Sequence, residues 1–231
     1  MKLMFHSKIM KKLFSLIELL IVISVIFVLM SLLMPGMRRF HEQANRVLCA
    51  NNLSQVHNGL IMYSYDMNGH LPDGQPAVRG AGVYAIKIGG LWLGHGKVYK
   101  HGYMTGIHNF YCPSTIHPFH SIDGGNMVYG GFRSNLSAKI PSIVTSSYQY
   151  RSTFGRPFRG PSALLDDLGS AIMSDHVTHN YSIRYTHGDG HTILYLDGST
   201  NWNNNVDFLS LDLSNVQHYA LKNQFWEKVD R

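Results

Sequence analysis

The apolar positions of this chain are concentrated in one long run near the amino terminus. Residues 14 to 34 are almost entirely apolar, and Glu18 is the one charged residue among them. A helix over this run rises by about 32 Å, which matches a bilayer hydrocarbon core of about 30 Å. The run is longer than the apolar region of a secretory signal and is not followed by a small-residue cleavage site. The pattern therefore predicts a membrane-spanning helix, and a carboxylate near its beginning indicates a function beyond anchoring.

A second helical pattern continues from residue 35 to residue 66, and it carries two apolar stripes in different phases. The first stripe is Met37, Phe40, Ala44 and Val47, and the second is Cys49, Leu53, Val56, Leu60 and Tyr63. We expect the first stripe to face neighbouring copies of the chain and the second to pack under the chain's own sheet. A single amphipathic helix with scattered apolar residues is the alternative. The turn residues 66–69, followed by Pro72, predict the end of this helix.

Residues 67 to 231 have the composition of one head domain, rich in Gly, Tyr, Asn and Ser and low in charge, which favours short strands and loops. Residues 91–103 are expected as Gly-rich loops, whereas residues 147–150 and 171–175 have the pattern of strands. Between residues 181 and 203, two Asp-Gly turn signals flank an apolar strand and predict an antiparallel meander. The expected fold is α+β, with a long helix packed on an antiparallel sheet.

Charge gives the orientation of the membrane segment. Residues 1 to 13 form a short basic leader that contains no Asp or Glu; its lysines are Lys2, Lys8, Lys11 and Lys12. The positive-inside rule then places the amino terminus in the cytoplasm, because the four lysines before the apolar run outnumber Arg38 and Arg39 after it. The formal net charge of +6 falls to +2 without the four leader lysines, so the sequence does not indicate nucleic-acid binding.

The junction between the leader and the apolar run carries a recognisable motif. Phe14-Ser15-Leu16-Ile17-Glu18-Leu19-Leu20 resembles the amino terminus of type IV prepilins and type II secretion pseudopilins. The resemblance implies cleavage between Leu13 and Phe14 by a prepilin peptidase, followed by N-methylation of Phe14. It also implies that Glu18 pairs with the amine of a neighbouring subunit and that Pro35 kinks the helix. The family's leader usually ends in Gly, whereas this one ends in Leu13.

Two further motifs strengthen the resemblance. Phe110-Tyr111-Cys112-Pro113-Ser114 is similar to a segment found in many pseudopilin-like proteins, and His187 followed by Asp197-Gly198 fits the H-x9-DG signature of prepilin-processing-associated proteins. By resemblance the chain is a pilin-like structural subunit rather than an enzyme, in a type II secretion or type IV pilus-like filament. Its implied place is the bacterial inner membrane, as a single-pass protein with a periplasmic head. Its implied partners are the prepilin peptidase, other pilin or pseudopilin subunits and the assembly machinery.

The two cysteines, Cys49 and Cys112, lie in the part of the chain expected outside the cytoplasm, where thiols can be oxidised. Cys49 belongs to the helix stripe that is expected to meet the head. A disulfide between the two is therefore the favoured interpretation, and two buried free thiols are the alternative.

Fourteen histidines raise the question of a metal site. The candidate ligands are Asp175, His176, His187, Asp189, His191 and Asp197. Residues 187, 189 and 191 would share a face if extended. The intervening Gly and Asp are ordinary turn residues, and no His-Glu-x-x-His pattern is present, so no metal site is assigned and no cofactor is expected. Major pseudopilins hold calcium in a carboxyl-terminal loop, and Asp207 and Asp212 are the candidate counterparts in this chain, without a matching ligand spacing. Binding of calcium or another divalent metal remains an open alternative.

Two other functions remain as alternatives. A membrane-anchored hydrolase could use His187 as a base oriented by Asp175 or Asp197, but no nucleophile motif of the G-x-S-x-G type is present. An adhesin-like module could use the Tyr, Trp and Asn loops of the head to bind a ligand, although such surfaces also occur in protein interfaces.

Overall fold

The computed structural model contains one long helix, two four-stranded β-sheets, a short helix and a 3₁₀ turn in its described part. The described residues are 15–72, 84–117, 120–124, 129–130, 143–151, 169–175 and 186–204. The α+β class expected from the sequence is confirmed at this level. The chain divides into two compact units, Met1–His41 and Glu42–Arg231. The predicted leader and the predicted cleavage residues Leu13 and Phe14 lie outside the described residues.

Helix α1 (Leu16–Asp66) begins directly after Ser15. The Ser15 backbone N–H donates to the Glu18 carboxylate at 2.9 Å, which is one half of a capping box. From Leu16 to Met34 the helix is long and apolar enough to cross a membrane, or to serve as a signal sequence, and none of this stretch is buried. α1 continues through position 35, and the kink at Pro35 stays a prediction.

The two apolar stripes of α1 have different environments. All five residues of the second stripe, from Cys49 to Tyr63, are buried, and Leu53, Val56 and Leu60 are fully so. The first stripe is exposed; its large residues, Met37, Phe40 and Val47, are 66–71% accessible. The packing of the second stripe against the head is therefore confirmed, and the helix ends at Asp66 as predicted. Asn68 and Gly69 follow with positive φ angles of 51° and 77°, which close the helix end.

The first sheet has the strand order β2-β1-β4-β3. Its strands are β1 (Ala85–Ile88), β2 (Leu91–Trp92), β3 (Tyr129–Gly130) and β4 (Ile143–Thr145). β3 pairs with β4 in parallel, so this sheet is mixed, whereas the sequence predicted antiparallel pairing throughout. β2 was expected as loop, because a two-residue strand has no alternation that a pattern could reveal. It is followed by a short helix, α2 (Gly96–Lys100), and a 3₁₀ turn, η1 (Ile107–Phe110).

The second sheet has the order β5-β6-β7-β8 and is antiparallel throughout. Its strands are β5 (Tyr148–Tyr150), β6 (Ala171–Asp175), β7 (His191–Tyr195) and β8 (Thr200–Asn203). The predicted turn at Asp197-Gly198 joins β7 to β8; Asp197 accepts from the Ser199 N–H at 2.8 Å, and Gly198 has a φ of 84°.

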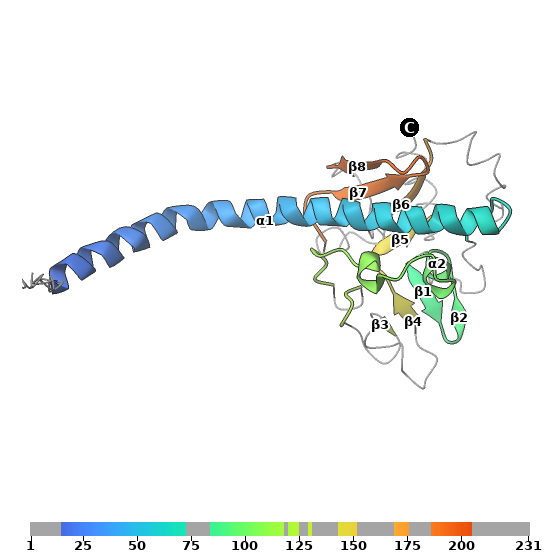
Figure 1. Ribbon diagram of the computed structural model, residues 1–231, viewed down its shortest axis with the longest axis horizontal. Coiled ribbons are helices and arrows are strands. Elements are labelled where there is room, and N and C mark those ends of the chain that lie inside the picture. The colour runs from blue at the N-terminus through green and yellow to red at the C-terminus, as the bar shows by residue number, and fades with distance from the viewer. Residues whose placement is uncertain are drawn as a thin grey trace, which may run out of the picture. The chain divides into compact units, whose positions relative to one another are not determined.

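Two sheets form, rather than the single one expected, because the chain changes partners at Ser146-Ser147. The Ser146 N–H donates to the carbonyl of Tyr84, the residue next to the Ala85–Thr145 pair, and so closes the β1–β4 ladder. The Ser147 N–H donates instead to the Phe110 carbonyl, outside both sheets; each distance is 2.9 Å. One hydrophobic core nevertheless joins both sheets to the second stripe of α1; it includes Ile86 and Val144 of the first sheet and Ile172 and Leu194 of the second. Figure 1 shows both sheets beside this part of α1.

Candidate functional site

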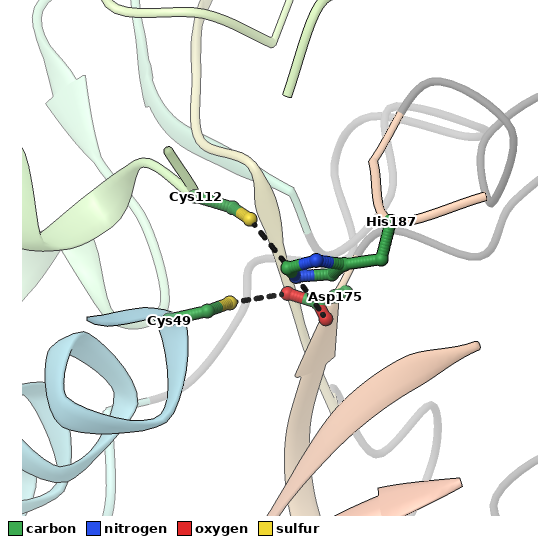
Figure 2. Close-up of side chains that lie close together, drawn as sticks. All are labelled: Cys49, Cys112, Asp175 and His187. Carbon is green, nitrogen blue, oxygen red and sulfur yellow. Dashed lines mark hydrogen bonds and ion pairs between the residues drawn. The ribbon is translucent and has the colours of Figure 1, made fainter. Parts of the chain in front are cut away.

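Four buried side chains from four separate parts of the head unit converge on one point. They are Cys49 of α1, Cys112 after η1, Asp175 at the end of β6 and His187 in the turn before β7. One sulfur, nitrogen or oxygen atom of each lies within 4.8 Å of those of the others. Figure 2 shows the four side chains pointing toward one another. No two of these residues are close in sequence, so the tertiary structure alone assembles the cluster.

Cys49 and Asp175 form one side of the cluster. Cys49 is turned inward because it belongs to the buried stripe of α1, and its thiol donates to Asp175 Oδ1 at 2.9 Å. The other carboxylate oxygen accepts from the Thr192 backbone N–H on the neighbouring strand β7 at 2.7 Å. The carboxylate of Asp175 is fully buried, and both of its oxygens are thereby held in place.

Cys112 and His187 form the other side. The Cys112 sulfur lies 3.2 Å from His187 Nε2, and the same nitrogen lies 3.5 Å from Asp175 Oδ2. Cys112 is positioned by the backbone next to it: the Asn52 side chain of α1 donates to the Tyr111 carbonyl at 3.1 Å. The helix therefore holds the Cys112 segment as well as contributing Cys49.

Glu42 of α1 fixes the orientation of the His187 ring. Its Oε1 lies 2.5 Å from His187 Nδ1, and its Oε2 accepts from the Ser114 hydroxyl at 2.9 Å. Because an ionised carboxylate can only accept, the proton of this contact resides on Nδ1. The other nitrogen, Nε2, therefore points at the cluster, and Trp202 packs its ring edge-to-face on the imidazole at 5.1 Å.

The surroundings of the cluster shift the pKa values of the two thiols in opposite directions. Burial by itself lowers the pKa of His187, but the hydrogen bond with Cys112 and the charge of Asp175 raise this pKa to about 9. Burial raises the pKa of Cys112, yet hydrogen bonds from Cys49 and His187 bring it down to about 7. Burial and the nearby Asp175 carboxylate raise the pKa of Cys49 well above its ordinary value. Cys112 is the acidic thiol, and Cys49 keeps its proton.

The structure separates the residues that the sequence suggested as metal ligands. Asp175 and His187 are brought together, but His191 is buried on β7 outside the cluster, and burial lowers its pKa to about 4. Asp189 binds Arg46 on the surface at 2.6 Å, and Asp197 serves the β7–β8 turn. The remaining candidates, His176, Asp207 and Asp212, lie outside the described residues.

Sequence reasoning treated the cysteines and the histidines separately and so missed their convergence. Cys49 and Cys112 are free thiols in the structure, although a disulfide was the favoured interpretation; the Cys49 thiol donates to Asp175, and the Cys112 sulfur lies against His187. Glu42 was not singled out at all. The sequence did single out Cys112 and His187 separately, because Cys112 belongs to the Phe110–Ser114 motif and His187 to the H-x9-DG motif. No pattern in the chain indicates that the two side chains meet.

Comparison of the chain with protein-family models, curated proteins and solved structures finds no match.

Proposed function

We propose that this chain is a pilin-like structural subunit, anchored in the inner membrane and assembled into a filament through its amino-terminal helix. A prepilin peptidase would cut between Leu13 and Phe14, leaving the head on the periplasmic side. Other pilin or pseudopilin subunits and the secretion or pilus machinery would be its partners.

The observation that carries the proposal is the exposed apolar surface of α1 between Leu16 and Met34. Its large apolar side chains are 44–81% accessible, on all sides of the helix. Exposure of such an apolar surface to water is unfavourable, whereas lipid or the packed helices of other subunits can cover it. The polar side chains inside this stretch are satisfied locally; the Ser24 and Ser31 hydroxyls donate to carbonyls three residues earlier at 2.7 Å.

The second half of α1 suits a link that transmits force. The same helix that exposes its apolar beginning contributes Leu53, Val56 and Leu60 to the core of the head unit. A force applied to the filament would therefore reach the head through a packed helix rather than through a loop.

Glu18 has two tasks under this proposal, and they can be separated. In the single chain its carboxylate accepts from the Ser15 N–H; in a filament it would pair with the charged amine of a neighbouring Phe14. Glu18→Gln keeps the acceptor for Ser15 and removes the charge, whereas Glu18→Ala removes both.

The test begins with mass spectrometry of the mature chain from native membranes, which we expect to begin with N-methylated Phe14. In cells that contain the assembly machinery, cross-linking should give ladders for the wild type and monomers for both Glu18 variants, with membrane insertion unchanged. A chain that retains residues 1–13 would contradict the proposal. Normal assembly of Glu18→Gln would show that the charge of Glu18 is not needed in the filament and that Glu18 serves only as a helix cap.

A further inference from the structure

We propose that Cys49, Cys112, Asp175 and His187 bind one Zn²⁺ ion, with Glu42 as the hydrogen-bond partner that orients His187. The ion would join α1 to three segments of the head. This site is independent of filament assembly and goes beyond it.

The spacing of the four side chains fits one small tetrahedral ion. Zinc–sulfur bonds of about 2.3 Å and zinc–nitrogen or zinc–oxygen bonds of about 2.0–2.2 Å place ligand atoms roughly 3.3–3.8 Å apart. Here the measured separations include 2.9 Å, 3.2 Å and 3.5 Å, and none exceeds 4.8 Å. Side-chain shifts of about 1 Å or less are therefore enough to close the four ligands around an ion.

The donor set selects the class of metal. Two thiolates, an imidazole and a carboxylate suit a borderline-soft ion such as Zn²⁺, whereas Ca²⁺ and Mg²⁺ prefer six or more oxygen ligands. All four ligand residues are buried, which is typical of a closed structural site rather than a catalytic one with an open position.

The surroundings of the ligands supply a second, independent argument. Metal-binding histidines usually donate their other ring N–H to a carboxylate, which leaves the free nitrogen for the ion. Glu42 makes this contact with Nδ1 of His187 and is itself held by Ser114. Asp175 is likewise fixed by the Thr192 N–H, and the Tyr148 hydroxyl lies 3.3 Å from the Cys49 sulfur.

The charges also favour a cation. A fully buried carboxylate beside two thiols is costly unless it is compensated, and the groups that compensate it here are one imidazole and hydrogen bonds. When Zn²⁺ binds, the proton of the Cys49 thiol and the proton shared by Cys112 and His187 leave to solvent. The centre then holds two thiolates, a neutral imidazole and a carboxylate, and with the ion it carries a net charge of −1. Arg46, which lies 3.5 Å from Glu42, offsets part of the remaining negative charge.

The experiment uses the full-length chain, purified from membranes in nonionic detergent. Elemental analysis should find one zinc per chain, and replacement by Co²⁺ should give the thiolate charge-transfer bands and the intense visible bands of a tetrahedral two-sulfur site. Both thiols should resist alkylation in the native protein and react once the metal is removed by a chelator. These measurements on the wild type do not depend on whether a variant folds.

Two variants add a matched comparison. Glu42→Gln leaves the four ligands in place and should weaken zinc binding about 10- to 100-fold while keeping the Co²⁺ spectrum of a two-sulfur site. Asp66→Asn removes an exposed carboxylate that lies 17 residues after Cys49 on α1 and accepts from the Tyr103 hydroxyl, and it should leave zinc affinity unchanged.

Two outcomes would contradict the proposal that the cluster binds zinc. A zinc-free chain with a Cys49–Cys112 disulfide, found by nonreducing peptide mapping, would show that the cluster is an oxidised cross-link. A zinc-free chain in which Cys112 is alkylated rapidly in the native state would show a reactive thiol–imidazole pair instead.

Discussion

Lowering the pH should destabilise the head through His95, a histidine that the fold keeps neutral. His95 is fully buried, and its ring packs against Phe110 and Tyr150 with centroid distances of 5.4 Å and 5.7 Å. Its Nε2 lies 2.9 Å from the Ser146 hydroxyl, which in turn donates to the Tyr148 carbonyl at 2.7 Å. Nε2 is therefore the donor to Ser146, and Nδ1 has no hydrogen-bond partner among the described residues.

Burial lowers the pKa of His95 from 6.5 to about 3. Because the folded pKa lies below the unfolded one, the stabilising contribution is complete above pH 6.5 and is lost as the pH falls toward 3. Lowering the pH from 7.5 to 5.0 therefore reduces the free energy of unfolding by about 2 kcal/mol through His95. The full pKa shift corresponds to about 5 kcal/mol.

The assay is urea unfolding of the full-length chain in nonionic detergent at pH 7.5 and 5.0, followed by tryptophan fluorescence. His95→Gln retains a donor for Ser146 but does not titrate in this range, so the wild type should lose about 2 kcal/mol more than the variant between the two pH values. Protonation of the other titrating groups is common to both proteins and cancels in this difference. Equal losses in both, within about 0.5 kcal/mol, would refute the account of His95.

Two further substitutions test the packing of the head by the same unfolding assay. Gly96→Ala would place a Cβ 2.3 Å from the Ile86 carbonyl oxygen, so we expect a loss of about 1–3 kcal/mol or more. A Cβ at Gly90 meets no atom of the described residues within 4 Å, so Gly90→Ala should stay within about 0.5 kcal/mol. Leu53→Ala empties a fully buried position on α1 and should cost about 2–5 kcal/mol, against about 0.5 kcal/mol or less for Leu48→Ala, which is 50% exposed. Similar losses within either pair would contradict the packing of these positions.

Elements with a strong local pattern were predicted closely. The second stripe of α1, the helix end at Asp66 and the turn at Asp197-Gly198 all occur where the sequence placed them. Periodicity and turn residues fix such features, because they depend on neighbours in the chain. The parallel pair of β3 and β4 and the short strand β2 carry no comparable local pattern, and they depend on partners far away in sequence.

The sequence by itself determined the apolar helix, its charge near the beginning and the α+β character of the chain, since these follow from residue type and spacing along a few turns. Only the tertiary structure decided that Cys49 and Cys112 meet Asp175 and His187, and that Glu42 holds the imidazole. The reason is physical: side chains on a helix, a loop, a strand and a turn converge only after the core between those elements has formed. A linear pattern records each residue but not the distances between their side chains.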